Sequence, residues 1–170
     1  MKFDGPPCWC GGRGCLALYA SGRGIADAAR ARAAGHDGKA LRDALGGDVA
    51  AITAPRVFAA AAGGEPQARV IVEEACQALA AMIGIVVNGL NPEEVIVTGG
   101  VAAAFATLER EVLRAASAYA FARALVRTRV RFVPGDKRQS MRGAAALVVY
   151  EMARARRGRG RSREEGRGVG

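Results

Sequence analysis

Residues 88–100 read NGLNPEEVIVTGG, and this stretch decides the class of fold. Asn88–Gly89 is typical of a helix end, and Asn91–Pro92 is typical of a turn. The compact run Val95–Thr98 consists of β-branched residues, as expected of a strand buried in a parallel sheet. Gly99–Gly100 closes the strand, so the stretch predicts an α/β fold.

Helices are predicted before this strand. Leu16–Ala34 is a long amphipathic segment, and the polar, glycine-rich residues 35–48 are interpreted as a connection. A short helix with Thr53 as its N-cap follows, and Gly63–Gly64 ends it. The strongest helix covers about Pro66–Asn88, where apolar residues recur every three or four positions and form one continuous face.

Another helix, over about Ala103–Ala124, and an alternating strand over Thr128–Val133 are predicted next. Ser140 is the predicted N-cap of a last helix, which carries Gly143–Val149 inward and ends near Arg154. Two strands do not form an independent sheet. The apolar faces of the predicted helices would therefore need further strands to pack on, and these strands would have to come from sequence outside these 170 residues.

The net charge of +9 is concentrated at the C-terminal end of the chain. Residues 154–170 hold seven arginines against two glutamates, and such a composition cannot bury enough apolar surface to order itself. We interpret these residues as a disordered, solvated tail, with weak, salt-sensitive contact to a polyanion as the alternative. Specific nucleic-acid binding is not expected.

Neither a membrane span nor a signal peptide is predicted. The best apolar stretch, Ala75–Val87, is shorter than the roughly 18 residues that a span needs and contains Gln77. Residues 1–7 lack the apolar core of a signal peptide. Because 51% of the residues are apolar and 24% are charged, as in ordinary globular domains, we expect a cytoplasmic protein without a membrane partner.

Three of the four cysteines lie in the sequence CWCGGRGC at residues 8–15. Its glycines allow the backbone to fold tightly, so the thiolates of Cys8, Cys10 and Cys15 can converge on one tetrahedral Zn²⁺. Because the cytosol is reducing, structural zinc is favoured over a disulfide. Three incidental loop cysteines are the alternative interpretation.

No fourth ligand is evident near these cysteines. His36, the only histidine, follows a predicted helix and is interpreted as a solvated loop residue rather than a ligand. Cys76 falls in the strongest helix and is interpreted as a core residue, since an unmodified cysteine packs as a small hydrophobe.

Residues 4–16, DGPPCWCGGRGCL, followed by Tyr19–Gly22, closely resemble the zinc loop of the ROK family. That family includes bacterial glucokinases, fructokinases, N-acetylhexosamine kinases and sugar-responsive repressors. Residues 88–101 resemble the strand and Gly-Gly turn that lie beside the nucleotide in the family, and Gly143–Ala145 is a weaker match. The resemblance extends from residue 4 to about residue 152.

The resemblance implies the actin-like, ribonuclease H-like ATPase fold, in which two α/β lobes close around ATP and a sugar. This chain would be an incomplete C-terminal lobe, with a zinc loop at 1–15, the α/β lobe at 16–153 and the tail at 154–170. In the family a histidine upstream of Cys8 completes the zinc site. The family's phosphate loop and catalytic aspartate have no counterpart in these 170 residues.

Two positions that the family uses for ligands are present. Gly99 and Gly100 would contact the nucleotide, because paired glycines after a strand let a ligand approach the backbone. The family's glutamate that reaches the sugar is replaced by Ala17, so no substrate-binding residue is assigned. A buried sugar hydroxyl without an acceptor costs about 1–3 kcal/mol, and hexose binding would be weakened accordingly.

Three functions are compatible with these residues. The leading one is the C-terminal part of a glucokinase-like enzyme that uses ATP and Mg²⁺ to convert a hexose to its 6-phosphate, inactive alone because the catalytic base is missing. The second is the sugar-sensing half of a ROK repressor, and the third is a degenerate dimerisation module. The resemblance also implies a homodimer.

Overall fold

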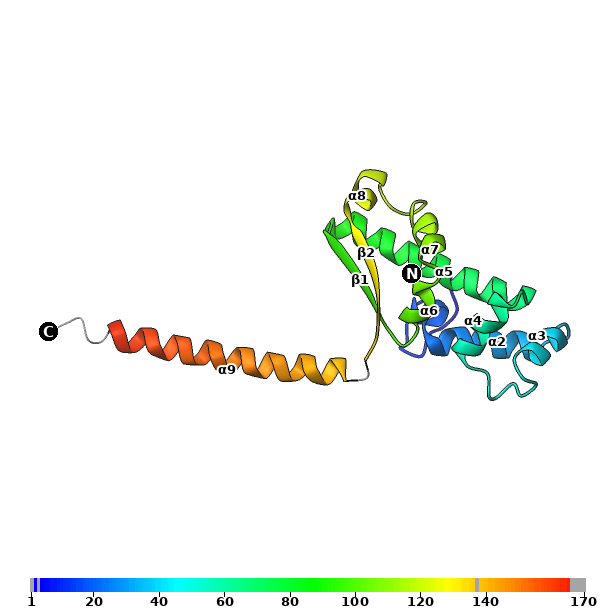
Figure 1. Ribbon diagram of the computed structural model, residues 1–170, viewed down its shortest axis with the longest axis horizontal. Helices are drawn as coiled ribbons and strands as arrows, with labels where there is room; N and C mark the ends of the chain where they lie inside the picture. The colour runs from blue at the N-terminus through cyan, green and yellow to red at the C-terminus, as the bar shows by residue number, and fades with distance from the viewer. Residues whose placement is uncertain (1, 3, 137, 166–170) are drawn as a thin grey trace. The chain divides into compact units, whose positions relative to one another are not determined.

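The computed structural model describes residues 2, 4–136 and 138–165, with the backbone alone at 139, 140 and 155–165. The chain divides into two compact units, Met1–Gly135 and Asp136–Gly170. Among the described residues, the first unit contains both strands and every helix except the last (Figure 1).

The sheet of the first unit has two parallel strands. β1 spans Glu94–Gly99 and β2 spans Arg129–Pro134, and the register pairs Val95 with Val130. Three helices connect the strands, so the predicted β-α-β unit is confirmed. The parallel pairing brings the carboxyl ends of both strands to the same edge.

The crossover between the strands is not the single helix predicted over Ala103–Ala124. It consists of α6, α7 and α8, which span Ala102–Ala106, Glu109–Ala116 and Ala122–Arg127. The hydroxyl of Thr107 donates to the carbonyl of Ala104, and the hydroxyl of Ser117 donates to the carbonyl of Arg114, both at 2.7 Å. Side chains that bond to nearby backbone in this way compete with helix continuation.

Five helices precede the sheet: α1 (Ala17–Ala20), α2 (Gly22–Ala34), α3 (Lys39–Ala44), α4 (Ala54–Ala62) and α5 (Pro66–Leu90). The predicted helix over Leu16–Ala34 is interrupted at Ser21, whose hydroxyl accepts a hydrogen bond from the Gly24 amide and caps α2. α3 lies inside the predicted connection 35–48. α4 and α5 confirm the predicted helices, although α5 ends at Leu90, slightly later than expected.

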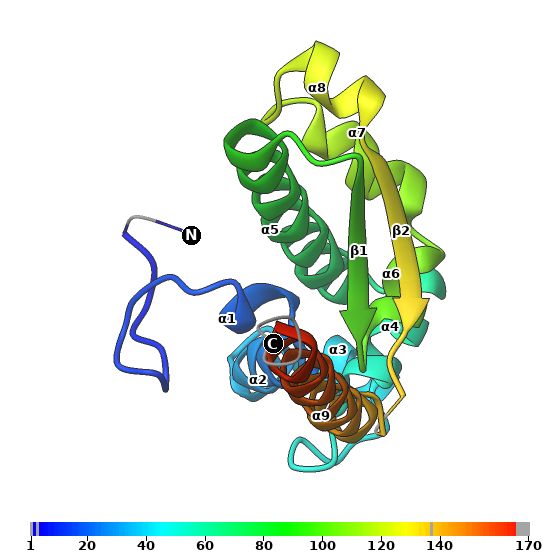
Figure 2. The same cartoon turned by 90° about the vertical axis from the view of Figure 1, so that its left-hand side faces the viewer.

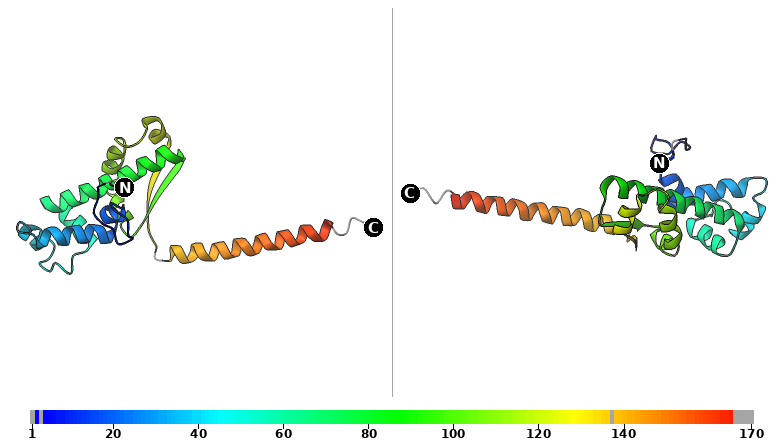
Figure 3. Two further views of the ribbon diagram at one scale, coloured as in Figure 1. Left: turned by 180° about the vertical axis from the view of Figure 1, so that it is seen from behind. Right: turned by 90° about the horizontal axis from the view of Figure 1, so that it is seen from above.

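α5 forms the centre of the first unit. It runs alongside the two strands (Figure 2) and packs against α2, α4 and α7, with α2 in blue beside α5 in green in Figure 3. Its buried residues are Ala68, Ile71, Val72, Ala75, Cys76, Leu79, Ala80, Ile83, Gly84 and Val87. Next to this face, Phe58 and Phe105 meet edge to face with ring centroids 5.6 Å apart.

α5 is also long and apolar enough to cross a membrane, judged by length and composition alone, although its uninterrupted apolar stretches are shorter than a span. It is the one such helix among the described residues. Core helices of globular proteins pass the same test. The burial of α5 within the first unit accounts for its apolar composition without a membrane.

The second unit contains α9, which spans Gln139–Glu165. Three expectations are wrong here. Ser140 lies inside the helix rather than at its N-cap, Gly143–Val149 are exposed rather than inward, and the helix continues past Arg154 to Glu165. Arginine, alanine and glutamate favour helix, which accounts for the continuation. Residues 166–170 of the predicted disordered tail lie outside the described residues.

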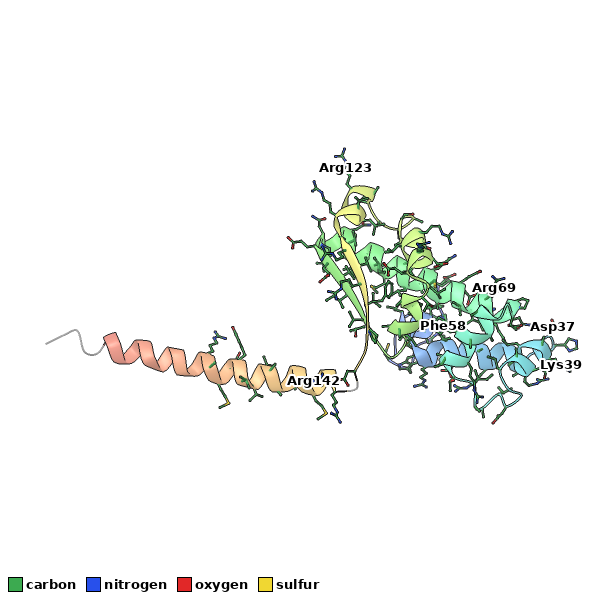
Figure 4. The ribbon with its side chains drawn as sticks, viewed as in Figure 1. Asp37, Lys39, Phe58, Arg69, Arg123 and Arg142 are labelled. Carbon is green, nitrogen blue, oxygen red and sulfur yellow. The ribbon has the colours of Figure 1, made fainter. Side chains whose placement is uncertain are left out.

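Within this unit the guanidinium of Arg142 pairs with the carboxylate of Asp136 at 3.0 Å (Figure 4). No other described element of the unit offers an apolar surface to α9. Leu147 and Val149 therefore remain exposed within it.

The C-terminal part of α5 is tied to the loop before α8. The side-chain amide of Asn88 donates to the carbonyl of Tyr119 at 2.9 Å and accepts from the amide of Phe121 at 2.8 Å. At Gly84, an added Cβ would lie 2.6 Å from the Cβ of Tyr119. The helix and the loop approach closely because residue 84 has no side chain.

We predict that Gly84→Ala destabilises the chain by about 1–3 kcal/mol, the usual cost of overpacking. Gly89→Ala is the matched control, because a Cβ at that position of α5 meets no atom within 4 Å, and alanine favours helix by about 1 kcal/mol. Urea unfolding of both variants would measure the difference. Equal stability of the two variants would contradict the packing of α5 against the Tyr119 loop.

Candidate metal centre and glycine turn

The cysteine-rich segment folds into a tight hairpin. The Cys8 amide donates to the carbonyl of Gly12 at 2.8 Å, and the Gly11 amide donates to the carbonyl of Cys8 at 3.0 Å. Gly11 and Gly14 have φ angles of 88° and 57°, which side-chain-bearing residues rarely adopt. A Cβ at Gly14 would also collide with the backbone of Lys2.

This hairpin brings the three predicted ligands together. The Sγ atoms of Cys10 and Cys15 are 3.5 Å apart, and those of Cys8, Cys10 and Cys15 all lie within 4.8 Å of one another. Tetrahedral zinc with Zn–S bonds of about 2.3 Å places sulfurs about 3.8 Å apart. The three sulfurs therefore fit Zn²⁺, and among the described residues no further His, Cys, Asp or Glu joins them.

In the metal-free cluster one thiol is easier to deprotonate than usual and a second is harder. The pKa of Cys10 is lowered by the backbone N–H of Gly12 and by the thiols of Cys15 and Cys8. The pKa of Cys15 is raised to about 11, chiefly by its hydrogen bonds with Cys10 and Cys8. A cation placed among the sulfurs would remove this conflict, since metal ligation stabilises thiolates.

The hairpin is fastened to the helices that follow it. The guanidinium carbon of Arg23 on α2 lies 4.5 Å from the ring centroid of Trp9, a cation–π contact worth about 0.5–1 kcal/mol at an exposed site. The hydroxyl of Tyr19 on α1 is buried beside Gly5, where a Cβ would approach it to 2.9 Å. These contacts hold the sulfur cluster against α1 and α2.

The other two candidate ligands lie elsewhere. His36 is exposed in the turn before α3, next to Asp37 (Figure 4), and is outside the sulfur cluster. Cys76 is 6% exposed in the core, which confirms its predicted place there. Burial, with smaller contributions from Glu111 and Glu73, raises the pKa of Cys76 to about 11.

The glycine turn occupies the carboxyl end of the sheet. Gly99 has a φ of 131°, and a Cβ at Gly99 or Gly100 would meet no atom within 4 Å. The Gly135 amide donates to the carbonyl of Gly99 at 3.2 Å, and a Cβ at Gly135 would lie 2.7 Å from the Gly99 Cα. The strand ends are thus held close together, while the backbone at Gly100 is open to a ligand.

One pocket was not predicted from the sequence. It has a volume of about 550 Å³ and lies between α4, α5 and α7, where Phe58 and Arg69 (Figure 4) line it together with Glu73, Cys76, Glu111 and Arg114. Charged residues three or four positions apart on a helix are typical of a solvated face. The spacing of these residues therefore gave no signal of a pocket.

Known structures share this arrangement. A ROK family transcriptional regulator homologous to the E. coli MLC protein matches with a TM-score of 0.62 and 26% identity over 77% of this chain and 32% of its own. A ROK family glucokinase from Streptomyces griseus, solved with glucose and AMPPNP, matches with a TM-score of 0.54 and 27% identity over 76% of this chain and 42% of its own. The fold is accordingly an incomplete, helix-rich α/β lobe of the actin-like class.

The chain belongs to the ROK family, whose model matches residues 1–151. A glucokinase of Halalkalibacterium halodurans is 37% identical over 120 residues, which cover 70% of this chain and 36% of that protein. An N-acetylmannosamine kinase of Citrobacter koseri is 37% identical over 98 residues, 58% of this chain and 28% of that protein. The chain spans about a third of the length of the curated relatives it matches.

We predict that the purified chain binds Zn²⁺ stoichiometrically and that Cys10→Ser abolishes this. Zinc competes with protons for the thiolates, so the metal should be lost as the pH is lowered. Cys76→Ser is the matched control and should retain zinc, because Cys76 lies outside the cluster. Metal analysis after dialysis measures each variant, and equal zinc in both variants would contradict the assignment.

We also predict that Cys76 reacts with a thiol reagent at least about a hundredfold more slowly than Cys10 at pH 8, since the thiolate is the nucleophile. The pKa of about 11 keeps Cys76 protonated at that pH. Its rate should rise as the pH approaches 11. Timed alkylation of the metal-free chain with peptide mapping measures both rates, and comparable rates for the two thiols at pH 8 would refute the burial of Cys76.

Proposed function

We propose that this chain is the C-terminal lobe of a ROK-family, glucokinase-like sugar kinase, which transfers phosphate from ATP to a hexose only together with a second lobe. The observation that carries the proposal is the pairing of a cysteine hairpin with an open Gly-Gly turn in a chain whose curated relatives include a glucokinase and an N-acetylmannosamine kinase. Phosphoryl transfer depends on positioning by groups from both sides of the nucleotide, so the lobe alone is inactive.

In this proposal Cys8, Cys10 and Cys15 hold a structural Zn²⁺, which supplies rigidity rather than chemistry. Gly99 and Gly100 contact the nucleotide, with Mg²⁺ bound to its phosphates. The open backbone at Gly100 supports this role because no side chain would block a phosphate there. The complete protein is a cytoplasmic homodimer without a membrane or specific nucleic-acid partner.

Sugar recognition is weaker in this proposal than in a relative with the family glutamate. Ala17 is the first residue of α1 and is half-buried. Its methyl group offers no acceptor to a sugar hydroxyl, and an unpaired buried hydroxyl costs about 1–3 kcal/mol. The sugar specificity therefore depends on residues of the other lobe.

A second candidate function is the sugar-sensing half of a ROK repressor. It is favoured by the transcriptional regulator, whose TM-score of 0.62 exceeds the 0.54 of the glucokinase. The kinase proposal is supported by curated kinases that are 37% identical to this chain, whereas the solved glucokinase and regulator are about equally identical to it, at 27% and 26%. The third candidate is a degenerate module that only dimerises. In that case Ala17, which stands where the family has a glutamate, marks the loss of sugar binding.

We predict that AMPPNP with Mg²⁺ stabilises the zinc-loaded chain by about 1.4 kcal/mol at ten times its Kd, a rise in Tm of about 3–6 °C for a domain of this size. Gly100→Leu should remove this shift by covering the turn. Gly89→Leu is the matched control, since a Cβ there also meets no atom within 4 Å. No shift with the unmodified chain, or an equal shift in both variants, would refute nucleotide contact at Gly100.

An assay of glucose phosphorylation distinguishes the three candidate functions. The chain alone should form no hexose 6-phosphate from glucose and ATP, whereas a longer chain that also carries the upstream lobe should form it. Zinc binding and a sugar-induced rise in Tm without phosphorylation in the longer chain would favour the repressor half. Zinc binding without any sugar response would favour the degenerate module.

A further inference from the structure

The three cysteines differ in how accessible they are to solvent. Cys10 is exposed, Cys15 is half-buried and Cys8 is 8% exposed. The Cys8 backbone is also held by two hydrogen bonds. Its amide donates to the carbonyl of Gly12, and its carbonyl accepts from the amide of Gly11. A solute that reaches the cluster therefore meets the sulfur of Cys10 first.

The same sulfur lies close to a second thiol. The Sγ atoms of Cys10 and Cys15 are 3.5 Å apart, and a disulfide bond of about 2.05 Å would require them to approach by about 1.5 Å. Gly11 follows Cys10, and a Cβ there would meet no atom within 4 Å. Space thus lies open beside Cys10, at Gly11, for the two sulfurs to approach each other. The backbone of Cys8, in contrast, is held by hydrogen bonds at its amide and its carbonyl.

We propose that Cys10 and Cys15 form an oxidation site, at which a peroxide converts the two thiols to a disulfide and releases the bound Zn²⁺. The sulfur of Cys10 attacks a peroxide oxygen, the O–O bond breaks, and a sulfenic acid and one water form. The sulfur of Cys15 then attacks the sulfur of Cys10, the S–O bond breaks, and the leaving hydroxide becomes a second water. In the zinc-bound form both sulfurs are thiolates, so the two protons that complete the two waters come from solvent. Two thiols are oxidised and one hydrogen peroxide is reduced to two waters.

Zinc leaves because two of its sulfur ligands are lost at once. Only Cys8 remains as a thiolate in the cluster, and a single thiolate does not retain structural zinc. Trp9 lies between Cys8 and Cys10 and stacks under Arg23 at 4.5 Å. As the only tryptophan, it reports any rearrangement of the hairpin by its fluorescence.

The test treats the zinc-loaded chain of 170 residues with stoichiometric hydrogen peroxide in the presence of a chromogenic zinc chelator. The number of reactive thiols in the unfolded, metal-free chain should fall from four to two. Peptide mapping should find Cys10 joined to Cys15 within one chain, with zinc release and a Trp9 emission change following the same time course. Dithiothreitol should restore all four thiols and zinc binding.

Two variants make the test specific. Cys76→Ser should respond as the unmodified chain does, because Cys76 is buried in the core. Cys15→Ser removes the second thiol, so oxidation of Cys10 should stop at the sulfenic or higher acids and no Cys10–Cys15 disulfide can form. Since Cys15→Ser can also lose zinc, the oxidation is repeated on the reduced, metal-free unmodified chain, where the same disulfide is expected. A disulfide through Cys8, a disulfide between chains, or zinc retained after oxidation would overturn the proposal.

Discussion

Burial of one face of α5 is the constraint on which both candidate sites depend. α1, α2, α4 and α7 all pack on this helix, and the chain passes from its C-terminal end into β1 within a few residues. The cysteine hairpin is positioned through α1 and α2, and the glycine turn is positioned through β1. Truncating a buried residue such as Ile71 or Ile83 would cost about 2–5 kcal/mol and would disturb both sites together.

The properties of the cysteine cluster depend on backbone geometry and on electrostatics. Positive φ angles at Gly11 and Gly14 bend the hairpin until three sulfurs meet. Without a metal, one thiolate is stabilised by the Gly12 amide and a second is opposed by its neighbours. The three sulfurs therefore fit a cation, and the same crowding brings the Sγ atoms of Cys10 and Cys15 to 3.5 Å.

Much of this arrangement could be predicted from residue patterns. The β-branched run before Gly99, the apolar spacing of α5 and the clustered cysteines each have a local cause, and the strand, the helix and the convergence of the three sulfurs are all observed. The predicted burial of the strand is wrong within the described residues, since Ile96 is 54% exposed and no residue of β1 is fully buried. The patterns failed where side-chain hydrogen bonds to the backbone break a helix and where distant residues form a pocket. The breaks at Thr107 and Ser117 depend on hydroxyls that bond to backbone carbonyls, and the α4–α5–α7 pocket depends on residues far apart in sequence. In α9, helix propensity extends the helix to Glu165 although this composition buries little apolar surface, which is the basis for expecting disorder.

The two strands of the sheet each have one hydrogen-bonded neighbour within the described part of the chain. Their outer edges carry no further strand within that part of the chain, and open sheet edges in β proteins invite pairing with another chain. Glu94 of β1 lies within 4.0 Å of Arg129 and 3.5 Å of Arg131 of β2, so exposed charges of both signs, with positive charge in excess, lie across the two strands. Such charges oppose association most strongly in dilute buffer, because salt screens them within about 10 Å at 0.1 M. The ionic strength of the buffer thus becomes a control on whether this lobe stays dispersed.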